Sequence, residues 1–300
     1  MFFYFTLKSR VLLEIYSKKI YNIPMLRCGF MDNIIQIKDL NFTYQDKVIF
    51  KNLNLNIKKN SFVSIIGPNG SGKSTLIRIL SGLNSYDGYI TINGHYLNKE
   101  NIKIIRRTLG IVFDNPDNQF IGQTVIDDLA FNLENLSYSK EEINKEISYI
   151  AKLFKIEKIL LSEPSNLNNS TKQKVAIASA LIHKPKILML DESLHQLDNK
   201  DKKIVFKALE TYKKEHDLTI ILITHNQEDT ILSDRIIVID KQKIILDGKV
   251  EEVYTKEKIL YNLGIEIPFI IKLSINLKLY DLIDEIYLDK DKLVNKLWLD

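Results

Sequence analysis

Residues 67–74 constrain the fold of this 300-residue chain more than any other segment, because they read GPNGSGKS. They match the pattern G-x-x-x-x-G-K-[ST], a glycine-rich loop whose backbone N–H groups hold the phosphates of a nucleotide. The apolar run 62–66 before the loop reads as a buried strand, and residues 76–80 after it read as a helix. A loop that joins strand to helix in this way predicts a nucleoside triphosphate site in an α/β fold.

The residue types in the loop suit phosphate chemistry. Gly70 and Gly72 have no Cβ, so successive N–H groups can turn inward, and the helix N-terminus adds positive potential. Lys73 can reach the terminal phosphates, and the Ser74 hydroxyl can ligate Mg²⁺. An ordinary glycine-rich turn does not explain a lysine and a serine at these positions. The residues expected to contact the nucleotide are Gly67, Pro68, Asn69, Gly70, Ser71, Gly72, Lys73, Ser74 and Thr75.

Composition excludes several classes of protein. The net charge is only +4, from 42 basic and 38 acidic residues without a long basic block, so a nucleic-acid partner is not expected. One cysteine, Cys28, excludes an internal disulfide framework and suits a reducing compartment. No segment reaches the roughly 20 apolar residues needed to span a bilayer.

The first 30 residues leave two interpretations open. Basic residues interleaved with apolar ones are compatible with a segment lying on a membrane surface. Residues 1–30 do not contain the n-region, apolar core and small-residue cleavage site of a signal peptide in that order. We favour an upstream start codon, with the working protein beginning near Met25 or Met31.

The hydrophobic pattern from residue 33 onward predicts alternating elements. Strands are expected at 34–40, 42–44, 48–57 (around a turn at Lys51-Asn52), 88–94, 109–113, 187–190, 219–223 and 235–239. Helices are expected from 124 to about 161 with a break at 137–140, at 171–182 and at 199–215. This alternation predicts a mainly parallel sheet covered on both faces, with an antiparallel start and a helical middle added to it.

Two carboxylates, Asp191 and Glu192, end the apolar strand 187–190, where open α/β sheets bind their ligands. Asp191 would hold Mg²⁺ through water, and Glu192 would polarise the attacking water, a role worth about 10²–10⁴ in rate. A solvated acidic turn is the weaker interpretation beside a phosphate loop. His225 follows strand 219–223 and would contact the γ-phosphate if the strands are parallel, although a lone histidine there is more often structural.

The order of these motifs resembles the ATP-binding cassette (ABC) transporter ATPases. After the phosphate loop come LMLDE at 188–192, LD at 197–198 and ITH at 223–225, and the resemblance covers about 33–250. More specifically, VFDNPDNQF at 112–120 resembles the VFQNPDNQF of energy-coupling factor transporter ATPases of the cobalt type. Residues 263–269 and 293–298 resemble the C-terminal extension of that subfamily.

The resemblance implies an α/β P-loop NTPase fold. Its RecA-like, mainly parallel sheet would carry an N-terminal antiparallel β subdomain and a helical signalling subdomain. Residues 1–30 would then be an extension or a mis-assigned start, 31–250 the ATP-binding domain, with the helical subdomain at about 119–183, and 251–300 the C-terminal extension.

Further site residues follow from the resemblance. Tyr44 matches the aromatic residue that stacks on adenine, worth about 1–3 kcal/mol by analogy with base stacking; packing of this tyrosine on a neighbour remains the alternative. Asp198 matches a loop that communicates across a dimer interface. In the family each ATP lies between the phosphate loop of one chain and the LSGGQ signature of the other.

The chain departs from the family pattern in the signature and at two single residues. The signature reads LNNST, with Asn168 for serine and with Asn169 and Ser170 for the two glycines whose backbone approaches a phosphate. Asparagine tolerates positive φ and caps helices, so the helix expected at 171–182 should form, but its contact with the phosphate should be weaker. Asp114 replaces a glutamine that contacts Mg²⁺ and the attacking water; it could still ligate Mg²⁺, but its charge would repel the γ-phosphate. His195 stands where serine is usual.

The resemblance implies an ATP- and Mg²⁺-dependent ATPase that energises a membrane importer, of the energy-coupling factor type for vitamins or other micronutrients. Its partners would be a second ATPase of this type in a heterodimer, a transmembrane coupling protein and a substrate-binding membrane subunit, at the cytoplasmic face of the membrane. Three alternatives stay open: a cassette ATPase of another importer, a soluble cassette protein acting on ribosomes or DNA, and a regulatory ATP binder that does not hydrolyse.

Overall fold

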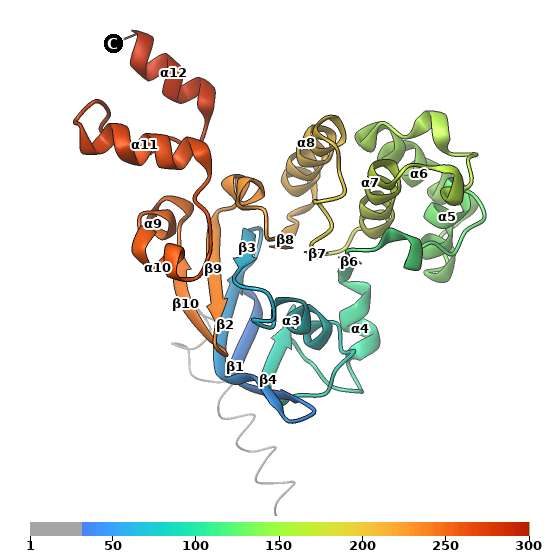
Figure 1. Cartoon of the computed structure of the whole chain (residues 1–300). Coiled ribbons are helices and arrows are strands. Elements are labelled where there is room, and N and C mark those ends of the chain that lie inside the picture. Colours follow the sequence, from blue (N-terminus) through green and yellow to red (C-terminus); the bar gives the residue numbers. More distant parts are fainter. Residues whose placement is uncertain (1–31, 300) are drawn as a thin grey trace, which may run out of the picture.

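The computed structural model describes residues 32–299 (Figure 1). The predictions made for residues 1–30, including the interpretation of Cys28, lie outside these residues. In the part of the chain that is described, no helix has both the length and the apolar character needed to cross a membrane.

Two sheets form the frame of the molecule. The larger has the order β10-β9-β3-β8-β7-β6, in which β10 is antiparallel and the other strands are parallel. The smaller is antiparallel, with the order β2-β1-β4-β5. The strands are β1 (Asn33–Tyr44), β2 (Lys47–Lys58), β3 (Phe62–Ile66), β4 (Asp87–Ile92), β5 (His95–Tyr96), β6 (Leu109–Val112), β7 (Ile187–Asp191), β8 (Thr219–Ile223), β9 (Arg235–Asp240) and β10 (Lys243–Gly248). The expected mainly parallel sheet with an antiparallel addition is confirmed.

Helices cover the larger sheet and extend from both of its edges (Figure 1). They are α3 (Lys73–Leu80), α4 (Ile102–Arg107), α5 (Val125–Asn135), α6 (Lys140–Phe154), α7 (Asn169–Leu181), α8 (Asn199–His216), α9 (Val250–Tyr254), α10 (Glu257–Asn262), α11 (Phe269–Leu279) and α12 (Lys290–Leu299). Short 3₁₀ turns are η1 (Pro116–Asn118), η2 (Glu157–Ile159), η3 (Pro164–Asn166) and η4 (Gln227–Leu232). The group α5–α7 lies at the β6 edge, and α9–α12 lie at the β10 edge.

Strand β7 contributes side chains to two hydrophobic cores, one on each face of the larger sheet. Successive side chains of a strand point to opposite faces. Leu188 and Leu190 therefore pack with the helices α5–α8, whereas Ile187 and Met189 pack with α3 and the smaller sheet. Every residue of β7 is buried, as is typical of a parallel strand covered on both faces.

Local differences from the predictions have identifiable causes. The turn expected at Lys51-Asn52 is a bulge within one continuous strand, with Asn52 at φ 52° and its backbone N–H bonded to the Asn41 side chain at 2.9 Å. The helix expected to run on to about 161 ends at Phe154, because Lys155 adopts the left-handed conformation. Strand β10 was not predicted.

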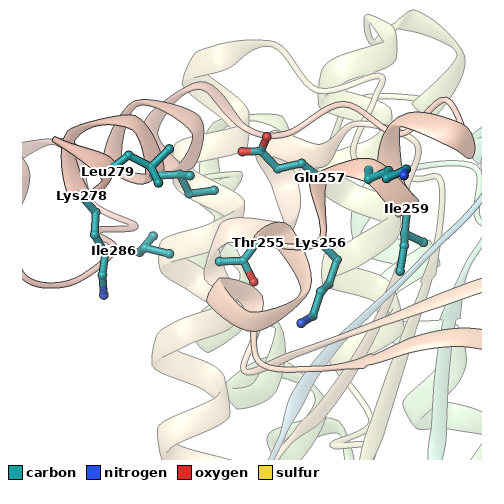
Figure 2. Close-up of a pocket in the computed structure, with 9 residues that line it drawn as sticks. Thr255, Lys256, Glu257, Ile259, Lys278, Leu279 and Ile286 are labelled. Atoms are coloured by element: carbon teal, nitrogen blue, oxygen red, sulfur yellow. The ribbon is translucent and has the colours of Figure 1, made fainter.

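The C-terminal helices pack on the larger sheet through a core of their own. Tyr254, Leu260 and Ile271 are fully buried against β9 residues such as Ile236 and Val238. Figure 2 shows a groove bordered only by residues of this region: Thr255, Lys256, Glu257, Lys258, Ile259, Ile275, Lys278, Leu279 and Ile286. None of the predicted site residues lines it.

Candidate functional site

The phosphate loop joins the end of β3 to the start of α3, and its backbone demands glycine. Gly67 has φ +153°, and a Cβ there would lie 2.1 Å from the carbonyl oxygen of Ile239 on β9. Gly72 has φ +102°, and a Cβ would lie 2.7 Å from the side chain of Ile49. The two glycines therefore let the loop pass close to neighbouring strands while its N–H groups stay available.

Lys73 is buried inside the curl of the loop. Its Nζ donates hydrogen bonds to the carbonyl oxygens of Gly67 and Pro68, at 2.8 and 3.0 Å. Burial lowers the pKa of Lys73, and the nearby charges of Glu192 and Asp191 oppose this effect. The ammonium group thus stabilises the conformation of the loop and lies where it can bind an anion.

Ser71 supplies an independent sign of a phosphate site. Its Oγ is buried and has no hydrogen-bond partner among the described residues. A buried hydroxyl without a partner is costly unless a ligand satisfies it. The hydroxyl lies in the same loop as Lys73, so the loop residues fit a bound phosphate group.

The metal-binding residues predicted from the sequence are in direct contact. Ser74 Oγ donates to Asp191 Oδ1 at 2.9 Å. Burial raises the pKa of Asp191; the Ser74 hydrogen bond opposes this rise, while the charges of Glu192 and Asp114 add to it. A hydroxyl and a carboxylate are oxygen ligands of the kind that Mg²⁺ takes together with nucleotide phosphates. Within residues 32–299 no group of three or more His, Cys, Asp or Glu could hold a metal ion.

Glu192 and His225 meet across neighbouring strand ends. His225 Nδ1 lies 3.1 Å from Glu192 Oε2. Their approach follows from strand pairing, because Asp191 at the end of β7 is in register with Ile223 at the end of β8. Glu192 has φ 53°, a conformation that is uncommon for a glutamate and is often found at functional sites. The structure therefore brings Glu192 and His225 together beside the phosphate loop.

Two residues that depart from the family pattern turn out to be partners. Asp114, in the loop after β6, lies with Oδ1 3.2 Å from His195 Nδ1. The same nitrogen contacts the carbonyl oxygen of Glu192, and Gln196 Nε2 donates to the carbonyl oxygen of Asp114 at 2.8 Å. Sequence reasoning noted both departures but missed the pairing, although their joint occurrence was a signal.

Side chains of the altered signature form hydrogen bonds within the same chain. Asn168 caps α7, since its side-chain oxygen accepts from the Thr171 N–H at 2.8 Å, and α7 accordingly begins at Asn169 rather than at the expected Thr171. Ser170 is buried, and its hydroxyl donates to Asp201 Oδ2 at 2.8 Å. The serine that replaces a glycine thus has a structural partner on α8.

A second set of contacts holds this region to the start of α8. Asp198 caps α8 by accepting from the backbone N–H groups of Lys200 and Asp201, and these bonds lower its pKa. Its own N–H donates to Ser170 Oγ at 3.1 Å. Lys174 forms a buried ion pair with Asp201 at 2.7 Å. Sequence reasoning missed Lys174 and Asp201, because nothing in their local pattern distinguishes them from other charged helix residues.

Tyr44 lies at the end of β1 with 62% of its surface exposed. The ring is therefore not part of the hydrophobic core. An exposed ring at a strand end is free to stack on a planar ligand.

The known proteins that this chain resembles in sequence are ATP-binding proteins of transporters. Residues 50–195 match the family model "ABC transporter". The energy-coupling factor transporter ATP-binding protein EcfA1 of Ligilactobacillus salivarius (strain UCC118) is 44% identical over 240 residues, which cover 79% of this chain and 85% of that protein. The protein of the same name from Streptococcus pneumoniae (strain ATCC BAA-255 / R6) is 38% identical over 274 residues, covering 89% and 99%.

Solved structures agree with these relatives. The structure of cbiO1 from Clostridium perfringens, described as part of the ABC transporter complex cbiONQ, has a TM-score of 0.70 and 31% identity, covering 79% of this chain and 96% of that one. The ATP-binding cassette MJ0796, a dimer in a post-hydrolysis state bound to ADP and Pi, has a TM-score of 0.65 and 28% identity, covering 72% and 98%.

Proposed function

Since the chain belongs to the ATP-binding subunits of energy-coupling factor transporters, a branch of the ABC transporter ATPases that energise import, we propose that it acts as one of two different ATPases in a heterodimer. The family binds ATP and couples its hydrolysis to transport. The heterodimer would dock on a transmembrane coupling protein at the cytoplasmic face of the membrane. A separate membrane subunit would bind the transported vitamin or other micronutrient.

One observation carries the ATP-hydrolysing part of this proposal: the hydrogen bond between Ser74 and Asp191 lies beside the contact between Glu192 and His225. The first pair would hold Mg²⁺, whose role is to neutralise the phosphate charge. The second pair would act on water: Glu192 would orient it and accept its proton, and His225 would hold the glutamate in position. The phosphate loop would bind the triphosphate, and Tyr44 would stack on adenine.

The two composite ATP sites of the heterodimer would differ. The chain retains its phosphate loop, Asp191, Glu192 and His225, so this half can work with an intact signature from the partner. The opposite site would depend on residues 168–170 of this chain. Because the Ser170 hydroxyl is already bonded to Asp201, and because Asn168 caps α7, that site would grip its phosphate weakly.

Capture of native partners tests the proposed assembly. A tagged full-length chain, purified from gently solubilised native membranes, is expected to bring down a second ATPase of this type together with integral membrane proteins. The control is the same tag on an unrelated protein. Recovery of the permease of another importer class, or of ribosomes, would instead favour one of the alternatives that the sequence left open.

Restoring the signature glycines tests the proposed asymmetry. Replacing both Asn169 and Ser170 by glycine in the reconstituted complex should raise ATPase activity severalfold, because the backbone can then approach a phosphate. The same change should lower stability by about 1–3 kcal/mol, since it leaves Asp201 without the Ser170 hydroxyl. Asn169→Gly alone is the matched variant, because it keeps that bond. Unchanged ATPase activity and unchanged nucleotide occupancy would mean that the signature is not limiting.

A further inference from the structure

We propose that His195 is a positioning residue whose imidazole donates a hydrogen bond to Asp114 and holds its carboxylate away from the terminal phosphate of ATP. This inference rests on the proposed function, in which the site binds ATP.

The hydrogen-bond geometry assigns the proton on His195. Its Nδ1 lies 3.2 Å from a carboxylate oxygen of Asp114 and also contacts the carbonyl oxygen of Glu192. Both partners are acceptors, so Nδ1 must carry a hydrogen and donate it. The imidazole therefore holds Asp114 on one side and is itself oriented by the backbone of Glu192 on the other.

The charges around His195 explain why Asp114 needs this partner. Asp114 faces it from the loop after β6, Glu192 from the loop after β7, and His225 from the loop after β8, with the two imidazole rings 5.9 Å apart. Asp114 also lies close enough to Asp191 for its charge to act there. A triphosphate would add further negative charge, so an unpaired Asp114 would repel it.

The contact between Asp114 and His195 can be removed without changing the backbone conformation of the loop after β6. Gln196 donates to the main-chain oxygen of Asp114, a bond that does not involve the Asp114 side chain. Gln119 also bonds the loop, through the backbone N–H and carbonyl groups of Phe113 at 3.3 Å. Substitutions of the Asp114 and His195 side chains should therefore change the charge at the site more than the path of the chain.

A double-mutant cycle on nucleotide affinity tests the inference on the purified full chain with Mg²⁺. His195→Ser should weaken ATP binding about three- to fivefold, because it releases the exposed, partly screened carboxylate of Asp114 toward the γ-phosphate, and ADP binding less than twofold, because ADP lacks that phosphate. Asp114→Gln should strengthen ATP binding slightly. The double variant Asp114→Gln/His195→Ser should recover the loss caused by His195→Ser. His95→Ser, on the smaller sheet, is the control and should change neither affinity.

Two results would overturn the inference while leaving the proposed function intact. Equal losses of ATP and ADP affinity in His195→Ser would indicate a general structural role. An unrecovered loss in the double variant would mean that His195 does not act through Asp114. A wild-type chain that bound neither nucleotide would be a different outcome, since it would remove the proposed function together with the inference.

Discussion

Replacing Glu192 by glutamine is expected to lower ATP turnover by about 10²–10⁴-fold, the usual contribution of a general base. Glutamine has nearly the same shape and can remain next to His225 Nδ1, which lies 3.1 Å from the glutamate in the native chain. It cannot accept a proton from water, because an amide is far less basic than a carboxylate. The contacts made by Lys73 and Ser74 do not involve this side chain, so ATP binding should persist.

The measurement is steady-state phosphate release by the complete complex, together with ATP binding to the same preparation. Glu210→Gln is the matched control, because Glu210 lies on the exposed face of α8, paired with Lys214. The control should keep full turnover. Native turnover in the Glu192→Gln complex would refute the assignment of Glu192 as the base, provided that the partner's site is silent.

Replacing Lys73 by alanine is expected to weaken ATP binding by about a hundredfold, as the loss of charge-assisted hydrogen bonds worth about 1.5–3 kcal/mol predicts. The side chain is buried and bridges the carbonyl oxygens of Gly67 and Pro68, so its loss also loosens the loop before any nucleotide arrives. Both effects act in the same direction.

Equilibrium binding of ATP, measured beside thermal unfolding, separates the two effects. A lower unfolding temperature reports the loosened loop, and the additional loss of affinity reports the missing phosphate contact. Lys58→Ala, at the exposed end of β2, removes an equal charge elsewhere and should leave ATP affinity within twofold. An ATP affinity within threefold of native in Lys73→Ala would exclude a phosphate-binding role for Lys73.

Sequence reasoning was most successful where one residue type satisfies one local requirement. The phosphate loop, the two carboxylates at the end of the apolar run 187–190 and the histidine after β8 were all recognisable, because each follows a short apolar segment. Parallel strands then place their carboxyl ends at one edge. The contact between Glu192 and His225 follows from this rule and from the register of β7 with β8.

Sequence reasoning was less successful where a residue's role depends on a distant partner. The sequence predicts a repulsive charge at Asp114 but does not show that His195 lies beside it. It predicts a weakened phosphate contact at Ser170 but does not show the bond from the Ser170 hydroxyl to Asp201, thirty-one positions away. Strand β10 was missed because its side chains alternate between partly buried and exposed positions at a sheet edge, which gives a weak apolar signal.

The sequence by itself determined the phosphate-loop motif, the sheet type and the family, because short motifs and strand periodicity are local properties of the chain. Only the tertiary structure decided which charges are paired. Ion pairs and buried hydrogen bonds join side chains from different elements, and their distances depend on how those elements pack. The phosphate loop can be recognised from eight residues. The partners of Asp114 and Ser170 can be identified only from the folded structure, because folding brings the loop after β6, the loop after β7 and the start of α8 together.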